Sequence, residues 1–144
     1  SKMVIVLDCN ILVMSLTSRS PYHRIFQSIV KGKFDLAINE EILLEYEEII
    51  QIKYGVRTAD SLITLLRELP NVRFMITYYR WNLIEADPED NKYVDCAISS
   101  GASFLVTEDK HFSILASIPF PKLSVLSIDG FIELLEKESE QPLS

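Results

Sequence analysis

The sequence predicts a single α/β domain built around a parallel sheet. Short apolar runs alternate along the chain with segments of helical periodicity, which is the pattern of successive βα units. The length of 144 residues suits one domain, and a hydrophobic share of 48% is typical of a globular protein. Because no internal repeat, linker or low-complexity tract is visible, we interpret residues 1–144 as one domain.

The first half of the chain shows three apolar runs typical of strands, with helical segments between them. Gly32 ends the first helical segment, because glycine readily adopts the backbone conformation that closes a helix. Asn39 is expected to cap the next helix, since its side-chain oxygen accepts a backbone N–H and Glu40 follows at the positively polarised end. The predicted elements are a strand at 3–7, a helix at 21–30, a strand at 34–38, helices at 39–52 and 58–68, and a strand at 72–76.

The second half continues this alternation after a stretch, 77–86, whose pattern indicates neither helix nor strand. Residues 1 and 2 are expected to precede a natural start near Met3, and residues 138–144 to form a frayed tail. The predicted elements are a helix at 88–100 ended by Gly101, a strand at 104–106, a short helix at 111–117, a strand at 123–126 and a helix at 129–137.

The composition restricts the classes of function. A net charge of −7 argues against broad, salt-dependent binding to nucleic acid, but it is compatible with nucleic acid held through a metal ion. An ordinary acidic surface is the alternative interpretation of this charge. No apolar run approaches the roughly 18 residues of a membrane span, and the start of the chain lacks the apolar core of a signal peptide. We therefore expect a cytoplasmic protein without membrane contact.

The cysteines and histidines do not show the spacing of a zinc site. Cys9 and Cys96 stand far apart in the sequence, and a disulfide is not expected between them in a reducing cytosol. Cys96 lies in an apolar segment and is interpreted as a small core residue. His23 and His111 are isolated in the sequence, so surface or capping positions are expected for them.

Two predicted strands deliver a carboxylate to the same edge of the sheet. The run at 4–7 ends at Asp8, and the run at 104–106 is followed by Thr107 and Asp109. Because ligands of open parallel sheets bind at the carboxyl ends of the strands, we expect these two acids to line one site. Carboxylate oxygens are the ligands that hard cations such as Mg²⁺ prefer, so the sequence predicts a divalent-cation site.

Two further acids stand where this fold would bring them to the same edge. Glu45 lies on the helix that follows the second strand, and Asp90 lies at the beginning of the helix at 88–100. Mg²⁺ or Mn²⁺ held by a few carboxylates keeps several waters and accepts a substrate phosphate. Asn10 is expected to add a neutral oxygen, and the Thr107 hydroxyl to orient a carboxylate or a water.

Each acid taken alone also has a structural interpretation. Asp8 is a suitable turn residue at a strand end, and Glu45 shares its helix with other acids that would form a solvated face. Asp90 occupies the third position of a capping box that Asp87 would begin, and Asp109 is placed to cap the short helix after it. The metal-site hypothesis therefore depends on the four acids jointly.

The ordered set of acidic motifs resembles the PIN domain family, which includes the toxins of bacterial and archaeal type II toxin–antitoxin pairs. The resemblance covers nearly the whole chain, from Met3 to about Leu135. The motifs that carry it are Leu7-Asp8-Cys9-Asn10, Glu45-Tyr46, Asp90-Asn91-Lys92 and Val106-Thr107-Glu108-Asp109, together with Cys96-Ala97-Ile98 and Gly101-Ala102-Ser103-Phe104-Leu105.

This resemblance implies a three-layer α/β/α sandwich with a central parallel sheet, and an Mg²⁺- or Mn²⁺-dependent endoribonuclease. The acids that would bind metal and act in catalysis are Asp8, Glu45, Asp90 and Asp109, supported by Asn10 and Thr107. The resemblance also implies RNA as the substrate, 5′-phosphate and 3′-hydroxyl product ends, an antitoxin protein as partner if the chain is a toxin, and a homodimer. Cys9 departs from the family, which more often has Thr or Ser there; a lost hydroxyl would loosen the support of Asp8.

Basic and aromatic residues provide candidates for contact with RNA. The basic residues that would steer the RNA backbone are Lys92, Lys110, Arg80 and Arg57, each of which is also explained as a surface charge. The aromatic residues Tyr79 and Trp81 flank Arg80 and would stack on unpaired bases, or else belong to the core or a dimer contact. Asp95, a candidate fifth acid, is interpreted as a charge on the helix surface.

Two other functions are compatible with parts of the pattern. A strand that ends in Asp8 also resembles the opening of an aspartate-based phosphatase of the haloacid-dehalogenase type. That class places a second acid two residues later, where this chain has Asn10, which cannot supply a proton at neutral pH. A catalytically inactive PIN-like scaffold that binds RNA or protein is the non-enzymatic alternative.

Overall fold

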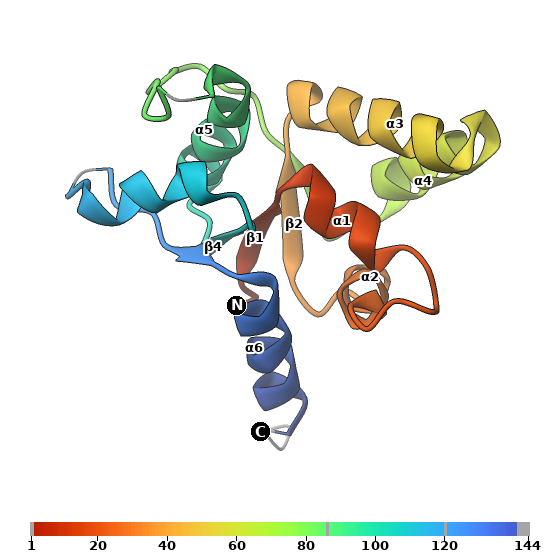
Figure 1. Cartoon of the computed structure of the whole chain (residues 1–144). Coiled ribbons are helices and arrows are strands. Elements are labelled where there is room, and N and C mark those ends of the chain that lie inside the picture. Colours follow the sequence, from red (N-terminus) through yellow and green to blue (C-terminus); the bar gives the residue numbers. More distant parts are fainter. Residues whose placement is uncertain (1, 86, 120, 141–144) are drawn as a thin grey trace.

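A five-stranded parallel sheet forms the centre of the part of the chain that the structure describes (Figure 1). The computed structural model describes residues 2–85, 87–119 and 121–140. The strands are β1 (Val4–Leu7), β2 (Asp35–Ile38), β3 (Val72–Phe74), β4 (Phe104–Val106) and β5 (Val125–Leu126), in the spatial order β3-β2-β1-β4-β5. All neighbouring strands are parallel, as the alternation of apolar runs and helical segments predicts.

Helices cover both faces of this sheet and complete a three-layer α/β/α sandwich. Figure 1 shows α1, α3 and α4 on one side of the sheet and α5 on the other. The helices are α1 (Cys9–Ser15), α2 (His23–Val30), α3 (Glu40–Tyr54), α4 (Val56–Glu68), α5 (Asn91–Ser100) and α6 (Ile128–Glu140), with short 3₁₀ helices η1 (Pro88–Asp90) and η2 (Lys110–Ser117).

The order in which strands are added to the sheet reverses at its central strand, β1, and this reversal determines where the candidate site is expected. From β1 the chain moves outward through β2 to β3, and it then returns to the opposite side of β1 to form β4 and β5. Such a switch point leaves a crevice at the carboxyl ends of the two strands that flank it. The register pairs Leu7 with Val106, so Asp8 and Thr107 follow directly on adjacent strands.

The core is built on β1, whose four residues are all buried. Helix α6 closes it from below in Figure 1, where Phe131 packs edge-on against Phe34 with ring centroids 5.2 Å apart. The largest fully buried side chains in the described residues include Tyr46, Tyr93, Phe34, Phe112 and Phe131. Within the described residues, no helix combines the length and apolar character needed to cross a membrane.

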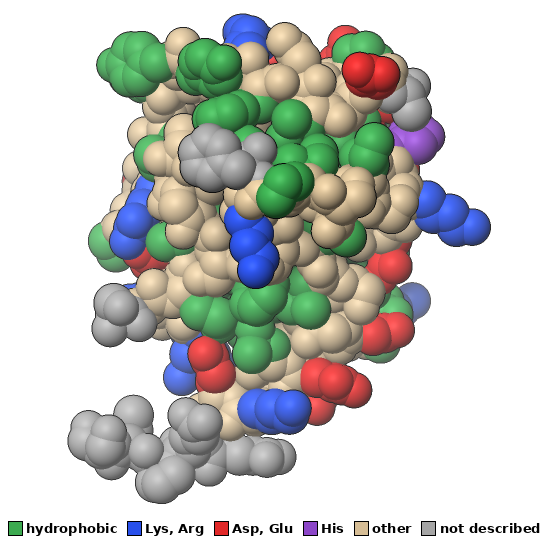
Figure 2. Space-filling view, turned by 90° about the vertical axis from the view of Figure 1, so that its left-hand side faces the viewer, with side chains coloured by type: hydrophobic (Ala, Val, Ile, Leu, Met, Phe, Trp, Pro, Cys, Tyr) green, Lys and Arg blue, Asp and Glu red, His purple; other side chains and the backbone are tan. Residues whose placement is uncertain are grey.

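An apolar groove of about 280 Å³ lies between η2 and β5, and Phe112, Leu115 and Leu123 contribute to its lining. The view of Figure 2 is taken from the side on which η2 and β5 lie in Figure 1, and on it hydrophobic side chains lie among scattered charged ones.

Several predicted boundaries differ from the structure, and one helix was not predicted. Helix α1 is only seven residues long and five of them are buried, so it shows no polar face from which a helical period could be recognised. Strand β3 ends at Phe74, two residues early, and β5 begins at Val125, two residues late. Helix α6 continues to Glu140, so residues 138–140 of the predicted tail are helical, and 141–144 lie outside the described residues.

Candidate active site

Asp8 is held at the end of β1 by two hydrogen bonds to β4 and the residue that follows it. Its backbone N–H donates to the carbonyl of Val106 (3.0 Å), and its carboxylate accepts a 2.7 Å hydrogen bond from the Thr107 hydroxyl. Only 8% of Asp8 is exposed. Burial raises the pKa of Asp8 above its usual range, the Thr107 hydrogen bond opposes this rise, and the charges of Glu45 and Asp109 reinforce it. Thr107 therefore orients a carboxylate, as the sequence predicts.

Asp109 is positioned by the same threonine. The Thr107 hydroxyl oxygen accepts a 3.0 Å hydrogen bond from the backbone N–H of Asp109. The Asp109 carboxylate in turn accepts from the backbone N–H of His111 (2.9 Å) and so caps η2. The capping interpretation of Asp109 is thus confirmed. The Thr107 hydroxyl joins the Asp109 backbone to the Asp8 carboxylate, and the charge of Asp109 contributes to the raised pKa of Asp8.

Asp90 lies at the junction of η1 and α5, close enough to Asp109 and Asp8 for their charges to act on it. Its carboxylate makes no capping hydrogen bond to α5; Asp87 instead caps η1 by accepting from the N–H of Glu89 at 3.2 Å. Burial, followed by the charges of Asp87 and Asp109, raises the pKa of Asp90 to about 6, although its contact with His111 lowers it. Only the Asp87 half of the predicted capping box is therefore formed. The carboxylate of Asp90 does not cap a helix and is available for other contacts.

His111 brings two of these acids together, a role that sequence reasoning missed. Its Nδ1 lies 3.4 Å from a carboxylate oxygen of Asp90 and 3.3 Å from one of Asp109. Among the described residues, possible ligand atoms of Asp87, Asp90 and His111 also lie within 4.8 Å of one another. The only signal in the sequence was that His111 follows Asp109 by two residues. Taken alone, this position indicated a surface or capping role for His111.

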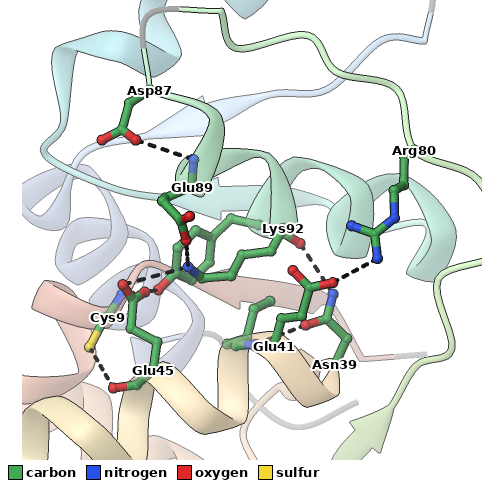
Figure 3. A network of polar contacts seen from close by, with 10 residues as sticks. Cys9, Asn39, Glu41, Glu45, Arg80, Asp87, Glu89 and Lys92 are labelled. Atoms are coloured by element: carbon green, nitrogen blue, oxygen red, sulfur yellow. Dashed lines mark hydrogen bonds and ion pairs between the residues drawn. The ribbon is translucent and has the colours of Figure 1, made fainter.

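Glu45 reaches the crevice from α3 and is held by residues of α5 (Figure 3). Its carboxylate accepts a hydrogen bond from the Tyr93 hydroxyl and lies 3.6 Å from Nζ of Lys92. The Tyr93 hydroxyl also accepts a 3.2 Å hydrogen bond from the backbone N–H of Cys9, directly after Asp8. Glu45 is thus not simply one of the solvated acids of α3, because its carboxylate contacts two residues of α5.

The thiol of Cys9 contacts α3 and not Asp8. Its Sγ lies 3.9 Å from the carbonyl oxygen of Glu45. Figure 3 marks this contact with a dashed line. Both Cys9 and Cys96 are free and buried, and burial raises the pKa of each thiol to about 12. The carboxylate of Asp8 receives its side-chain hydrogen bond from Thr107, which does not depend on the residue type at position 9.

The remaining predicted residues lie in several different environments. Asn10 is exposed on α1, and Lys110 and Arg57 are also exposed. Arg80 forms a 3.0 Å ion pair with Glu41 and is directed at α3 in Figure 3. The rings of Tyr79 and Trp81 meet edge-on with centroids 4.6 Å apart, and Tyr79 is exposed.

Two charged residues of α5 are buried where the sequence suggested surface positions. Asp95 is only 3% exposed and accepts a 3.0 Å hydrogen bond from the backbone N–H of Trp81. Lys92 is also buried, and its partner is Glu45. The interpretation of both as surface charges was wrong, because Lys92 pairs with Glu45 of α3 and Asp95 accepts a hydrogen bond from the Trp81 backbone, and periodicity reveals neither contact.

The predicted ligands are all carboxylates, the donor type that suits a hard divalent cation. Asp8, Glu45, Asp90 and Asp109 come from four separate segments, and the pKa values of Asp8 and Asp90 are raised by burial and then by neighbouring negative charge. A divalent cation would relieve that repulsion, and oxygen-rich sites of this kind suit Mg²⁺ or Mn²⁺.

The sequence model described as PIN domain matches residues 4–111. The chain belongs to the PIN domain family. The matched range contains all four acids and ends within η2, so β5 and α6 of this PIN domain lie beyond it. A search of curated proteins found no match.

Solved structures of PIN-domain proteins share this fold at low sequence identity. VapBC2 from Rickettsia felis, bound to a DNA fragment from its promoter, is 19% identical with a TM-score of 0.59, over 87% of this chain and 98% of that one. VapC20 from Mycobacterium tuberculosis, a toxin that cleaves the sarcin–ricin loop, is 15% identical with a TM-score of 0.56, over 76% and 93%. The PIN domain of RRP44 from T. brucei is 10% identical with a TM-score of 0.54, over 96% and 84%.

Proposed function

We propose that this PIN domain is a metal-dependent endoribonuclease that hydrolyses phosphodiester bonds in RNA. The proposal is supported by the hydrogen bonds of the Thr107 hydroxyl to Asp8 and Asp109 at the ends of β1 and β4, and by His111 Nδ1 lying 3.4 Å from Asp90 and 3.3 Å from Asp109. Family membership supports a nuclease, and VapC20 is an RNA-cleaving member of similar fold.

Asp8, Asp90 and Asp109 would hold one or two Mg²⁺ or Mn²⁺ ions, with Glu45 as a further ligand or a group that positions water. The cation would lower the pKa of a water, polarise the phosphoryl group and neutralise the leaving oxygen. Thr107 keeps Asp8 and Asp109 in fixed relation through its two hydrogen bonds. The imidazole of His111 contacts Asp90 and Asp109 and is also partly exposed to solvent.

The proposal extends to the partners of the protein. RNA is the substrate, with Lys110 as an exposed basic residue beside Asp109 and Tyr79 as an exposed ring for unpaired bases. The toxin–antitoxin relatives support a toxin role with an antitoxin protein as partner. The proposal further includes a cytoplasmic location, coverage of the acidic site by the antitoxin, and a homodimer.

The deciding experiment compares the wild type with Asp109→Asn on structured and unstructured RNA, with Mn²⁺ and with chelator. We expect cleavage by the wild type only with Mn²⁺, product ends carrying 5′-phosphate, and loss of cleavage in the variant. Asp60→Asn on α4 is the matched control, since Asp60 is an exposed acid outside the crevice. Cleavage by Asp109→Asn at the wild-type rate would contradict the proposal.

The same samples distinguish the two alternative functions. Rapid hydrolysis of a small phosphomonoester without action on RNA would indicate the aspartate-based phosphatase. RNA or protein binding without uptake of Mn²⁺ would indicate the inactive scaffold.

A further inference from the structure

Lys92 is a buried cation inside an acidic crevice. It lies in the first turn of α5, and its side chain is 7% exposed. Burial of an ammonium group is costly unless a negative group compensates it. The groups that contact Nζ of Lys92 must therefore supply a compensating negative charge.

The Nζ atom of Lys92 points at the carboxylate of Glu45 (Figure 3). It lies 3.6 Å from Oε2 of Glu45 and 3.7 Å from Oε2 of Glu89. The Glu89 side chain is 87% exposed and is screened by solvent, whereas that of Glu45 is 32% exposed. Nζ also lies 5.4 Å from the ring centroid of Tyr93. Glu45 is accordingly the principal partner of Lys92.

These contacts divide the crevice into two parts. On one side, Glu45 is compensated by Lys92 and by the Tyr93 hydroxyl, both from α5. On the other side, the imidazole Nδ1 of His111 lies 3.4 Å from a carboxylate oxygen of Asp90 and 3.3 Å from one of Asp109. Glu45 is thus paired with a lysine, whereas no lysine or arginine in the described part of the chain forms an ion pair with Asp8, Asp90 or Asp109.

We propose that the ammonium group of Lys92 compensates the charge of Glu45 and so takes the place that a second divalent ion would otherwise occupy. The inference rests on the proposed function, and it specifies that function as a site for a single divalent ion. Asp8, Asp90 and Asp109 hold that ion, and Glu45 orients water and is not a ligand. Lys92 acts through Glu45 and is a positioning residue.

The first test counts the Mn²⁺ ions bound per chain, by calorimetry and by electron paramagnetic resonance, in the wild type and in Lys92→Met. We expect one ion in the wild type and two in Lys92→Met, because the methionine fills similar space but leaves Glu45 uncompensated. Lys92→Arg should restore a count of one. Lys137→Met on α6 is the matched control, since Lys137 is exposed and lies away from the crevice.

The order of RNA cleavage in Mn²⁺ should follow the ion count. At Mn²⁺ concentrations below saturation, the rate should be first order in Mn²⁺ for the wild type and second order for Lys92→Met. A merely structural role of Lys92 would change the thermal midpoint of the metal-free protein and leave this order unchanged. First-order dependence in Lys92→Met with an ion count of one would overturn the inference.

A second variant decides the question if Lys92→Met fails to fold. Glu45→Gln keeps the shape of the side chain and removes its charge, so it should bind one Mn²⁺ ion with the affinity of the wild type. Loss of Mn²⁺ affinity in Glu45→Gln, or two ions in the wild type, would overturn the role of Lys92 alone. No Mn²⁺ uptake by the wild type would overturn the proposed function and this inference together.

Discussion

The hydroxyl group of Thr107 donates a 2.7 Å hydrogen bond to the carboxylate of Asp8. The same oxygen accepts from the backbone N–H of Asp109 at 3.0 Å. One side chain therefore sets the relative position of two acids that belong to different strand ends.

Replacement of Thr107 by valine should damage both stability and metal binding. The change keeps the branched shape but leaves the buried Asp8 carboxylate without this donor, at a cost of about 2 kcal/mol in the free energy of unfolding. The pKa of Asp8 should rise further, because the Thr107 hydrogen bond is the main influence that lowers it. Urea unfolding and Mn²⁺ titration measure the two effects.

Thr107→Ser is the matched control, because it keeps the hydroxyl and removes only a methyl group. Equal loss of Mn²⁺ affinity in both variants would show that the methyl group, and not the hydrogen bond, is responsible.

The raised pKa of Asp90 predicts a dependence of stability on pH in the metal-free protein. Its pKa is about 6 in the folded state, above the ordinary value of 3.8, so the folded state binds the proton more tightly than the unfolded state does. The stabilisation from this proton is fully present below about pH 4 and is lost as the pH rises through about 6. Asp90→Asn should remove this part of the pH profile, as urea unfolding in chelator would measure.

Bound divalent metal should stabilise the folded protein more at higher pH, because a cation binds the ionised carboxylate. The rise in melting temperature on adding Mn²⁺ should be larger at pH 7 than at pH 5 in the wild type. An equal rise at both values would argue that Asp90 is not a ligand.

Asp95 should control the segment around Trp81 without affecting the metal site. Its buried carboxylate accepts the Trp81 N–H, so Asp95→Ala removes the acceptor at a cost of about 1–3 kcal/mol. Trp81 is the only tryptophan, and its fluorescence reports the change directly. Asp95→Asn retains an acceptor oxygen and should give a smaller shift, and Mn²⁺ affinity should stay at the wild-type value in both. A large loss of Mn²⁺ affinity would instead make Asp95 part of the metal site.

Cys9 and Cys96 should be unreactive in the folded protein. Both thiols are buried and have pKa values near 12, so little thiolate is present at pH 8. Alkylation by iodoacetamide, followed by mass spectrometry, should modify neither cysteine until denaturant is added. Rapid modification of Cys9 alone would show that α1 opens around the crevice.

Much of the fold and the outline of the site could be predicted from local patterns. The ends of β1 and β4, which Asp8 and Thr107 follow directly, were recognisable because apolar runs stop there, and parallel pairing places the two strand ends side by side. Asn39 caps α3 as predicted, by accepting the N–H of Ile42 at 2.9 Å, because this interaction joins residues only three positions apart.

The features that sequence reasoning missed depend on partners from distant segments. Lys92 and Asp95 look like surface charges until Glu45 and the Trp81 backbone are placed beside them. Helix α1 was missed for a different reason, since its buried residues leave no polar face in the pattern.

The pairing of β1 with β4 joins segments about a hundred positions apart, as the Thr107–Asp8 separation of 99 shows. Contacts of such long range form late and slowly, because the intervening chain must first be ordered. On the ribosome, the proposed site therefore remains incomplete until β4 has emerged. Asp8 is translated early, but the proposed activity has to await the ordering of β4 beside β1.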